Sequence, residues 1–193
     1  LSAHKFGGPK GIGILLINEK SRLFLRNKDI ALTHEYSIRQ GTQSLPLICG
    51  MYQAFKNISG LITFSNYDTE FKNNKTILLR DYLVDLLKDN KYVEITGSID
   101  NRLPNHLSFI LFNKNHFPIK AYKIINFMSD NNISISSGSA CSSSNENPSK
   151  VLTKLGLKND KLFSNIRLSF GEENTIEEID KFYDLLLNCI EKF

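Results

Sequence analysis

The chain of 193 residues has few cysteines, no long apolar run and no cluster of charge of a single sign. Three cysteines without metal-ligand spacing argue against a disulfide framework and against a zinc site. No apolar run approaches the roughly 18 residues of a membrane-spanning helix, and no secretory signal pattern is present. We therefore expect a cytoplasmic protein, without bound metal, that does not enter a membrane.

The net charge is +4, but Lys and Arg residues are scattered among Asp and Glu residues along the chain. Binding to DNA or to a membrane surface through charge needs basic residues gathered into a patch or stripe. We therefore expect no direct binding to DNA. With 41% hydrophobic residues, the chain is long enough and apolar enough to bury a core.

Apolar spacing along the chain predicts helices and strands in alternation. Helices are expected at residues 45–58, 69–89, 122–128, 148–155 and 175–192, and strands at 12–17, 92–96, 107–112, 133–136 and 165–170. Residues 23–25 are expected to pair with the first strand, and residues 29–43 to form a loop. This order is typical of a layered α/β or α+β fold. We expect a boundary near residue 60, between a strand-and-helix unit (1–60) and a compact C-terminal domain (61–193).

Lys5 lies at the head of a segment rich in glycine and proline, residues 2–11 (Ser-Ala-His-Lys-Phe-Gly-Gly-Pro-Lys-Gly). A lysine that attacks a carbonyl must be neutral and rigidly held, and small neighbours would let a flat cofactor ring approach the backbone. Ser2 and His4 offer hydrogen-bond donors to an anionic phosphate on the same turn. The alternative is that Lys5 and Lys10 are surface lysines beside a Gly-Pro turn.

Cys141 lies in a segment of small polar residues, 136–143 (Ser-Ser-Gly-Ser-Ala-Cys-Ser-Ser), which we expect to be exposed and mobile. Cys49 and Cys189 lie in apolar helical patterns and are expected to be small core residues. A thiol becomes nucleophilic only where nearby donors or charges favour the thiolate. The alternative for Cys141 is therefore a spare cysteine in a serine-rich loop.

The pattern Ser-x-His-Lys-x-x-Gly-Pro-Lys-Gly around Lys5 resembles the cofactor-lysine motif of cysteine desulfurases, which are class V aminotransferase-like enzymes of fold type I. The resemblance implies the C-terminal part of such a transferase, namely the end of its large domain plus a small α/β domain. It also implies that Lys5 bonds covalently to pyridoxal 5'-phosphate, and that Ser2 and His4 contact the phosphate of this cofactor.

Residues 34–42 resemble the His-Glu-x-x-x-Arg-x-Gly-Thr stretch of the same family. The resemblance implies that Thr42 reaches across a dimer interface to the cofactor phosphate of the partner subunit, and a hydroxyl beside a glycine suits an anion. The alternative is a solvated loop with a Gly-Thr turn. Residues 31–33 depart from the family, which has glycines there, and Ser44 stands where asparagine is frequent.

Residues 136–143 resemble the catalytic loop of the long-loop class of cysteine desulfurases, and residues 148–156 resemble the helix that follows that loop. The resemblance implies that Cys141 is the nucleophile. It also implies that Arg167, in the Arg-x-Ser-x-Gly segment, holds the substrate α-carboxylate, for which the planar guanidinium is well suited. The alternative for Arg167 is a strand-edge arginine that pairs with Glu172 or Glu173.

Three further features are interpreted as structural. Residues 102–105 (Arg-Leu-Pro-Asn) fit the family and are expected to have an architectural role. His106 and His116 have no catalytic motif around them and are expected to be surface residues. Thr175 with Glu178 fits a capping box at the start of the last helix.

The resemblance implies an enzyme that moves the sulfur of L-cysteine to a persulfide on Cys141 and releases L-alanine. The implied partners are a second copy, in a homodimer, and sulfur acceptors such as an iron–sulfur scaffold or a tRNA-thiolation protein. Because the chain opens on Leu1 and lacks the family's preceding histidine and aspartate, we expect the second half of a larger enzyme, with little activity alone. Two other interpretations stay open, a dimerisation or scaffold module derived from such an enzyme and a related pyridoxal phosphate-dependent aminotransferase or lyase.

Overall fold

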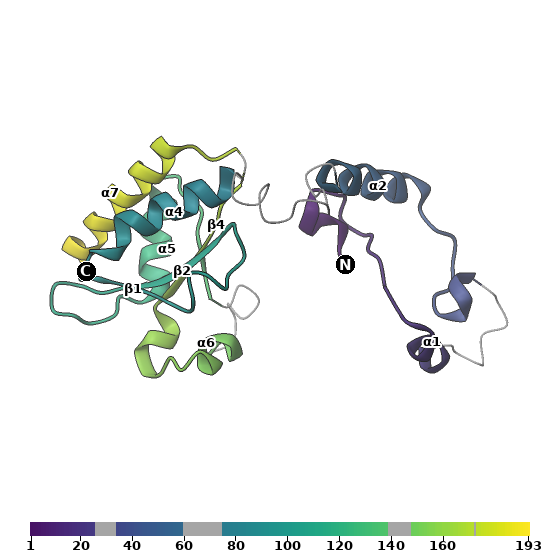
Figure 1. Ribbon diagram of the computed structural model, residues 1–193, viewed down its shortest axis with the longest axis horizontal. Helices are drawn as coiled ribbons and strands as arrows, with labels where there is room; N and C mark the ends of the chain where they lie inside the picture. The colour runs from purple at the N-terminus through teal and green to yellow at the C-terminus, as the bar shows by residue number, and fades with distance from the viewer. Residues whose placement is uncertain (26–33, 60–74, 139–147, 172) are drawn as a thin grey trace. The chain divides into compact units, whose positions relative to one another are not determined.

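The computed structural model describes residues 1–25, 34–59, 75–138, 148–171 and 173–193. The chain divides into two compact units, Leu1–Tyr67 and Asp68–Phe193 (Figure 1). The boundary expected near residue 60 lies outside the described residues, and the interpretation of the two units as domains stays a prediction. No helix in the described part of the chain is long and apolar enough to cross a membrane.

The first unit is built around helix α2. Its described elements are η1 (Ala3–Phe6), α1 (Glu19–Leu25), η2 (His34–Ser37) and α2 (Leu45–Ser59). The helix expected at residues 45–58 is confirmed as α2. Pro46 fits in its first turn because the backbone N–H groups there have no partner inside the helix.

The buried strand expected at residues 12–17 is wrong. Among the described residues this segment makes one isolated antiparallel bridge, between Ser2 and Gly13, and Leu15 and Leu16 are 67% and 77% exposed. Residues 23–25 do not pair with it, because they end helix α1. Asn18 begins that helix, since its Oδ1 accepts a hydrogen bond of 2.8 Å from the N–H of Ser21.

The second unit is an antiparallel sheet covered by helices. Its described elements, in chain order, are α4 (Lys75–Lys88), β1 (Val93–Ile95), β2 (His106–Leu111), α5 (Ala121–Asp130), β3 (Ser136–Ser137), α6 (Lys150–Lys154), η3 (Asn159–Phe163), β4 (Asn165–Ser169) and α7 (Ile176–Lys192). The sheet has the order β1-β2-β4-β3 with antiparallel neighbours. The helices and strands expected here are confirmed in kind, except that residues 69–74 of the first expected helix lie outside the described residues. The strand expected at 133–136 is shorter in the structure and consists of Ser136 and Ser137, and the short helix η3 was not predicted.

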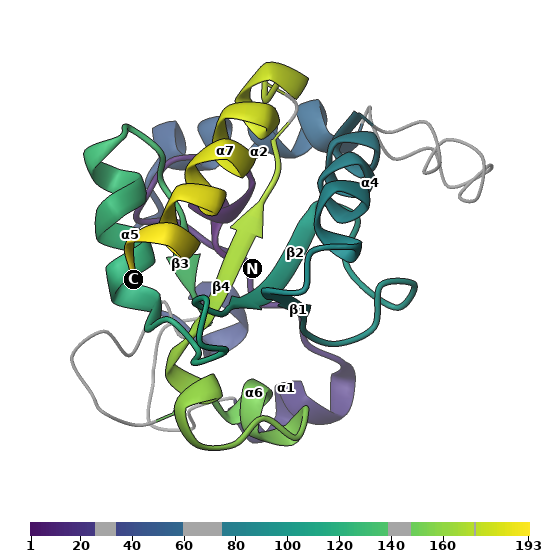
Figure 2. The same cartoon turned by 90° about the vertical axis from the view of Figure 1, so that its left-hand side faces the viewer.

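The two faces of this sheet differ in polarity because side chains alternate along each strand. Helices α4, α5 and α7 cover one face (Figure 2). Leu107 and Phe109 of β2 and Ile166 of β4 are fully buried on this side. The residues that alternate with these along the strands, such as Ser108 and Arg167, lie on the other face of the sheet. The pairing register places Ser108 and Arg167 opposite each other.

Helix α7 starts with the capping box that the sequence predicts. The Glu178 N–H donates to the hydroxyl of Thr175 at 3.3 Å, and the Thr175 N–H donates to the Glu178 carboxylate at 3.2 Å. These two bonds satisfy N–H groups that the first turn of a helix leaves without partners.

Candidate functional site

The lysine segment of the first unit folds into one tight turn. Residues 3–6 form the short 3₁₀ helix η1, and Gly7 ends it in the left-handed region with φ of 81°, a conformation that costs glycine little. The N–H of Gly8 donates to the carbonyl of Ala3 at 2.9 Å. A Cβ on Gly8 would lie 2.9 Å from the Cβ of Ala3 and 3.0 Å from its carbonyl oxygen. The turn therefore requires glycine at this position.

Two contacts hold this turn against the rest of the unit. The N–H of Ala3 donates to the carbonyl of Ile12 at 3.1 Å, and the side chain of Ala3 is fully buried. On helix α2, Gly50 leaves room for Pro9, because a Cβ at Gly50 would lie 3.1 Å from Cγ of Pro9. The backbone that carries Lys5 is thus fixed from both sides.

The turn brings together three of the predicted site residues. Ser2 caps η1, and the N–H of Lys5 donates to the carbonyl of Ser2 at 3.0 Å. Ser2 itself has extended backbone, with φ of −110° and ψ of 125°, and directly precedes the helical residues. Ser2, His4 and Lys5 are all exposed. The hydroxyl of Ser2 makes no capping hydrogen bond.

Thr42 lies elsewhere in the first unit, on the exposed stretch that leads into α2. Gly41 before it has φ of 96°, and its carbonyl accepts a hydrogen bond from Arg39 at 3.3 Å. Just upstream, Glu35 and Tyr36 also have positive φ values, of 48° and 57°, which residues with a Cβ adopt at a cost in energy. No hydrogen bond among the described residues joins Thr42 to the lysine turn.

Arg167 belongs to the second unit and lies on the polar face of its sheet. It is half-buried in strand β4, between β2 and β3. Its Nε donates to the hydroxyl of Ser136 on β3, and that hydroxyl donates to the carbonyl of Arg167, both at 3.2 Å. The strand-edge position in the predicted alternative is wrong, because β4 has a neighbour on each side; Glu172, one of the two expected partners, lies outside the described residues. Among the described residues Arg167 has no carboxylate partner.

A pocket of about 350 Å³ opens on this polar face beside Arg167. Its polar lining includes Thr96, Arg102, His106, Ser108, Asn165 and Arg167. None of the described residues that line it is acidic. The pocket is therefore positively charged and suits a small anion.

A buried ring of hydrogen bonds forms part of the lining of this pocket. The hydroxyl of Ser108 donates to Oδ1 of Asn165 at 2.9 Å, and Nδ2 of Asn165 donates to the hydroxyl of Thr96 at 3.0 Å. The Thr96 and Ser108 hydroxyls lie 2.7 Å apart. Since the proton of Ser108 goes to Asn165, Thr96 is the donor that closes the ring. The ring joins strands β2 and β4 to Thr96, the residue that follows β1.

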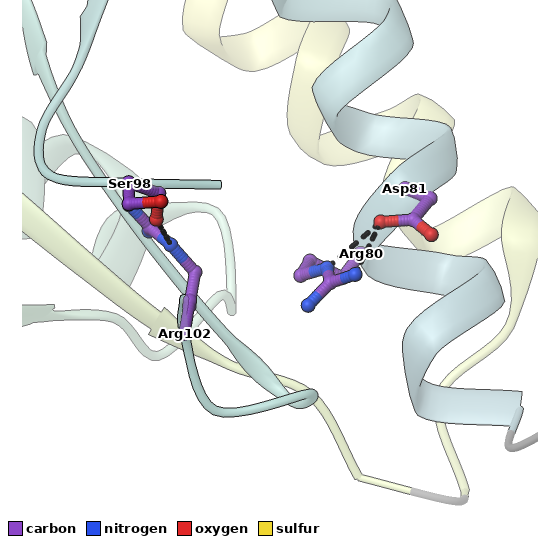
Figure 3. Close-up of polar contacts among 4 residues, drawn as sticks. All are labelled: Arg80, Asp81, Ser98 and Arg102. Carbon is purple, nitrogen blue, oxygen red and sulfur yellow. Dashed lines mark hydrogen bonds and ion pairs between the residues drawn. The ribbon is translucent and has the colours of Figure 1, made fainter. Parts of the chain in front are cut away.

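Arg102 has the architectural role that the sequence predicts, but it leaves one donor unused. Its Nε donates to the carbonyl of Ser98 at 2.9 Å, and its Nη2 donates to the carbonyl of Thr96. Nη1 is buried without a hydrogen-bond partner among the described residues. Burial lowers the pKa of Arg102, and the charge of Arg80, which pairs with Asp81 on α4, lowers it further (Figure 3).

The family model described as aminotransferase class-V matches residues 1–182. The chain belongs to the class-V aminotransferase family. Similar proteins include those named cysteine desulfurase IscS of Vibrio vulnificus, 36% identical over 192 residues, and of Photobacterium profundum, 34% identical over 193 residues. Each alignment covers 100% of this chain and 44% of the relative. The chain thus spans less than half the length of these relatives.

Solved structures confirm the expected fold class. A NifS-like protein matches with a TM-score of 0.75 and 27% identity, over 100% of this chain and 45% of that one. A NifS-like protein from Rickettsia africae matches with a TM-score of 0.64 and 26% identity, over 85% of this chain and 39% of that one. A cysteine desulfurase from Thermococcus onnurineus, at 20% identity and a TM-score of 0.66, supports the fold alone.

Enzymes of this class-V family depend on pyridoxal phosphate, and the lysine turn fits such a group. Lys5 is exposed on a backbone fixed by Ala3 and Gly8. The hydroxyl of Ser2, in the same turn, makes no capping hydrogen bond and is available to a phosphate oxygen. The backbone at Gly7 borders open space, since a Cβ there would meet no atom within 4 Å, and this leaves room for a flat ring.

Cys141 lies outside the described residues, as does the whole segment 139–147. The residues on either side of that segment are described, and both Gly138 and Ser149 line the pocket of Arg167. A Cβ on Gly138 would lie 2.7 Å from Cδ1 of Leu152 and 3.2 Å from Oδ1 of Asn165. The segment that carries Cys141 therefore starts from a point packed against α6 and the hydrogen-bonded ring.

Of the two cysteines that were expected in the core, one is buried and the other is exposed. Cys189 is fully buried, as expected, and burial raises its pKa to about 11. Cys49 is exposed, so its expected place in the core is wrong for the described residues. The spacing of apolar residues correctly predicted that residues 45–58 form a helix with an apolar side. Spacing does not show whether another element of the structure covers that side.

Two site features were missed or misjudged from the sequence. His116 is exposed as expected, whereas His106 is half-buried and lines the Arg167 pocket. The alternation of polar and apolar residues in 106–109 is a signal for this placement, since it sets His106 and Ser108 on the same face of a strand. The partners of Ser108 in the buried ring come from distant parts of the chain and left no such signal.

Proposed function

We propose that the complete gene product is a pyridoxal phosphate-dependent cysteine desulfurase that takes the sulfur of L-cysteine onto Cys141. One observation carries the proposal: Gly138 and Ser149, which flank the segment of Cys141, both line the pocket of Arg167. Cys141 follows Gly138 by three positions, so their Cα atoms can be at most about 11 Å apart. The thiol is therefore tethered close to the arginine that would hold the substrate carboxylate.

Lys5 is assigned the covalent link to the cofactor, and Ser2 and His4 its phosphate. Thr42 would contribute a hydroxyl to the phosphate of the partner subunit in a homodimer. When bound, pyridoxal phosphate withdraws electrons from the substrate carbon skeleton.

Arg167 is assigned the α-carboxylate of the substrate. Its guanidinium is oriented by the Ser136 hydroxyl and has no carboxylate partner among the described residues, so it is free to form charge-assisted bonds, each contributing about 1.5–3 kcal/mol. These bonds fix the amino acid relative to the pocket, which converts an encounter with Cys141 into a positioned reaction.

Sulfur transfer then follows from the thiolate of Cys141. Its Sγ attacks the substrate sulfur, an S–S bond forms, and the C–S bond breaks with its electron pair left on the substrate carbon. That carbon takes up a proton from the ammonium group of Lys5, and the product leaves as L-alanine. The persulfide passes its sulfur to an acceptor, either an iron–sulfur scaffold or a tRNA-thiolation protein in the cytoplasm.

The test uses the complete gene product with pyridoxal phosphate and L-cysteine, and measures alanine and sulfide. Cys141→Ser is expected to lose alanine formation at least 100-fold while the visible absorbance of the bound cofactor stays. Lys5→Ala is expected to lose that absorbance. The chain supplies matched controls, since Cys49→Ser and Lys10→Ala change an exposed thiol and an exposed amine outside the assigned site. Full activity of Cys141→Ser would contradict the nucleophile, and unchanged absorbance of Lys5→Ala would contradict the cofactor lysine.

A further inference from the structure

His106 occupies a place in the second unit to which the resemblance assigns no role. It is the first residue of β2 and is paired in register with Ser169, while Ser108, two residues on, is paired with Arg167. Side chains two apart on a strand point to the same face. His106 and Arg167 are thus diagonal neighbours on the polar face, where such pairs are roughly 7–8 Å apart and within reach of long side chains.

The cations around this pocket are held in place and are not neutralised there. Arg102 is fixed by two carbonyl groups of its own loop, and Arg167 is fixed by the Ser136 hydroxyl. Neither arginine has a carboxylate partner among the described residues, and the described lining contains none. Three basic side chains therefore face one small pocket, counting His106.

The charge of His106 is coupled to both arginines. Burial lowers the pKa of His106, and the positive charges of Arg102 on the preceding loop and Arg167 on β4 lower it further. Binding of an anion beside Arg167 would offset these two charges and favour the protonated imidazole. By linkage, protonation of His106 must then favour binding of the anion by the same factor.

We propose that His106 is a second carboxylate-binding residue of the Arg167 pocket, which takes up a proton and donates a hydrogen bond when the amino-acid substrate binds. The proposal rests on the proposed function for the identity of the ligand. The site itself is argued from three observations: the pairing register of β2 with β4, the pocket that His106 shares with Arg167, and the lack of an acidic residue in the described lining. Affinity for the substrate then rises as pH falls, while the sulfur chemistry stays with other residues.

The test titrates histidine in the complete gene product, labelled with ¹³C-histidine and followed by NMR. L-Alanine is the probe, because it has the carboxylate and amine of the substrate without the reactive sulfur. We expect the titration midpoint of His106 to rise by about one pH unit at saturating alanine, which corresponds to about tenfold tighter binding to the protonated form. His116, exposed and outside the pocket, is expected to stay unchanged and serves as the internal control.

A second arm measures alanine affinity at pH 5.5 and pH 8 in His106→Gln and in the matched control His116→Gln. The control is expected to keep the tenfold pH dependence of the unchanged protein, and His106→Gln to lose it while retaining the cofactor absorbance. A His106 midpoint that alanine does not move, or a pH dependence that survives in His106→Gln, overturns the inference. If alanine moves the midpoint but no sulfur is released from cysteine, the carboxylate site stands and the proposed desulfurase function fails.

Discussion

Asn165→Ala tests the buried hydrogen-bond ring on which the Arg167 pocket is built. Asn165 is 1% exposed and takes part in three hydrogen bonds, with Ser108, with Thr96 and with the carbonyl of Phe109. A hydrogen bond of this kind contributes about 0.5–1.5 kcal/mol net, and a buried hydroxyl left unpaired adds to the cost. We therefore expect the substitution to lower the free energy of unfolding by about 2–4 kcal/mol.

The measurement is urea unfolding of the complete gene product, followed by circular dichroism. Asn188→Ala on the exposed side of α7 is the matched control, with an expected change within about 0.5 kcal/mol. Because the ring acts as a unit, Ser108→Ala should cost less in the Asn165→Ala background than alone, by about 1 kcal/mol. A loss below about 1 kcal/mol for Asn165→Ala, or strict additivity of the pair, would refute the reasoning.

Three further predictions concern helix α7. Thr175→Ala removes the capping hydroxyl and should lower the free energy of unfolding by about 1 kcal/mol in the same urea assay; an unchanged midpoint would show that the capping box contributes nothing. Cys189, whose pKa is raised to about 11 by burial, should resist alkylation at pH 8, whereas exposed Cys49 should react. As pH rises, the thiol of Cys189 ionises in the unfolded chain at a lower pH than in the folded chain. The free energy of unfolding should therefore fall as pH rises from about 9 to about 11. Mass spectrometry of the labelled peptides checks the reactivity, and equal labelling of both cysteines without denaturant would contradict it.

The second unit was largely predictable because its signals are local. Alternating polar and apolar residues in 165–170 predict a strand with an apolar face, and Ile166 and Leu168 of β4 are buried in the core. Helical spacing from Ile179 to Ile190, with the capping pair at its start, predicts α7 and its buried side. In both cases the residues that decide the structure lie within a single element.

The first unit was less predictable because several of its apolar residues, among them Leu15 and Leu16, are exposed. Residues 12–17 are apolar enough for a buried strand, yet a strand needs another strand beside it, and apolar composition carries no information about pairing. The glycine at 13 is explained instead by a close approach of backbone, since a Cβ there would lie 2.5 Å from the carbonyl oxygen of Leu1. The cap at Asn18, followed by Glu19, was a helix signal that outweighs the apolar residues at 23–25.

The pocket itself depends on strand register, which no single segment specifies. Ser108 lies opposite Arg167 only because β2 and β4 pair in one of several registers that their alternating patterns would allow. A slip of one residue would put Phe109 or Leu107 opposite Arg167 and turn every polar side chain of β2 toward the core helices. The buried ring opposes such a slip, because Asn165 and Ser108 can bond only when both face the same side of the sheet. A motif can thus identify Arg167 as a carboxylate ligand, but its neighbours in the pocket, His106 among them, follow from the register that this ring stabilises.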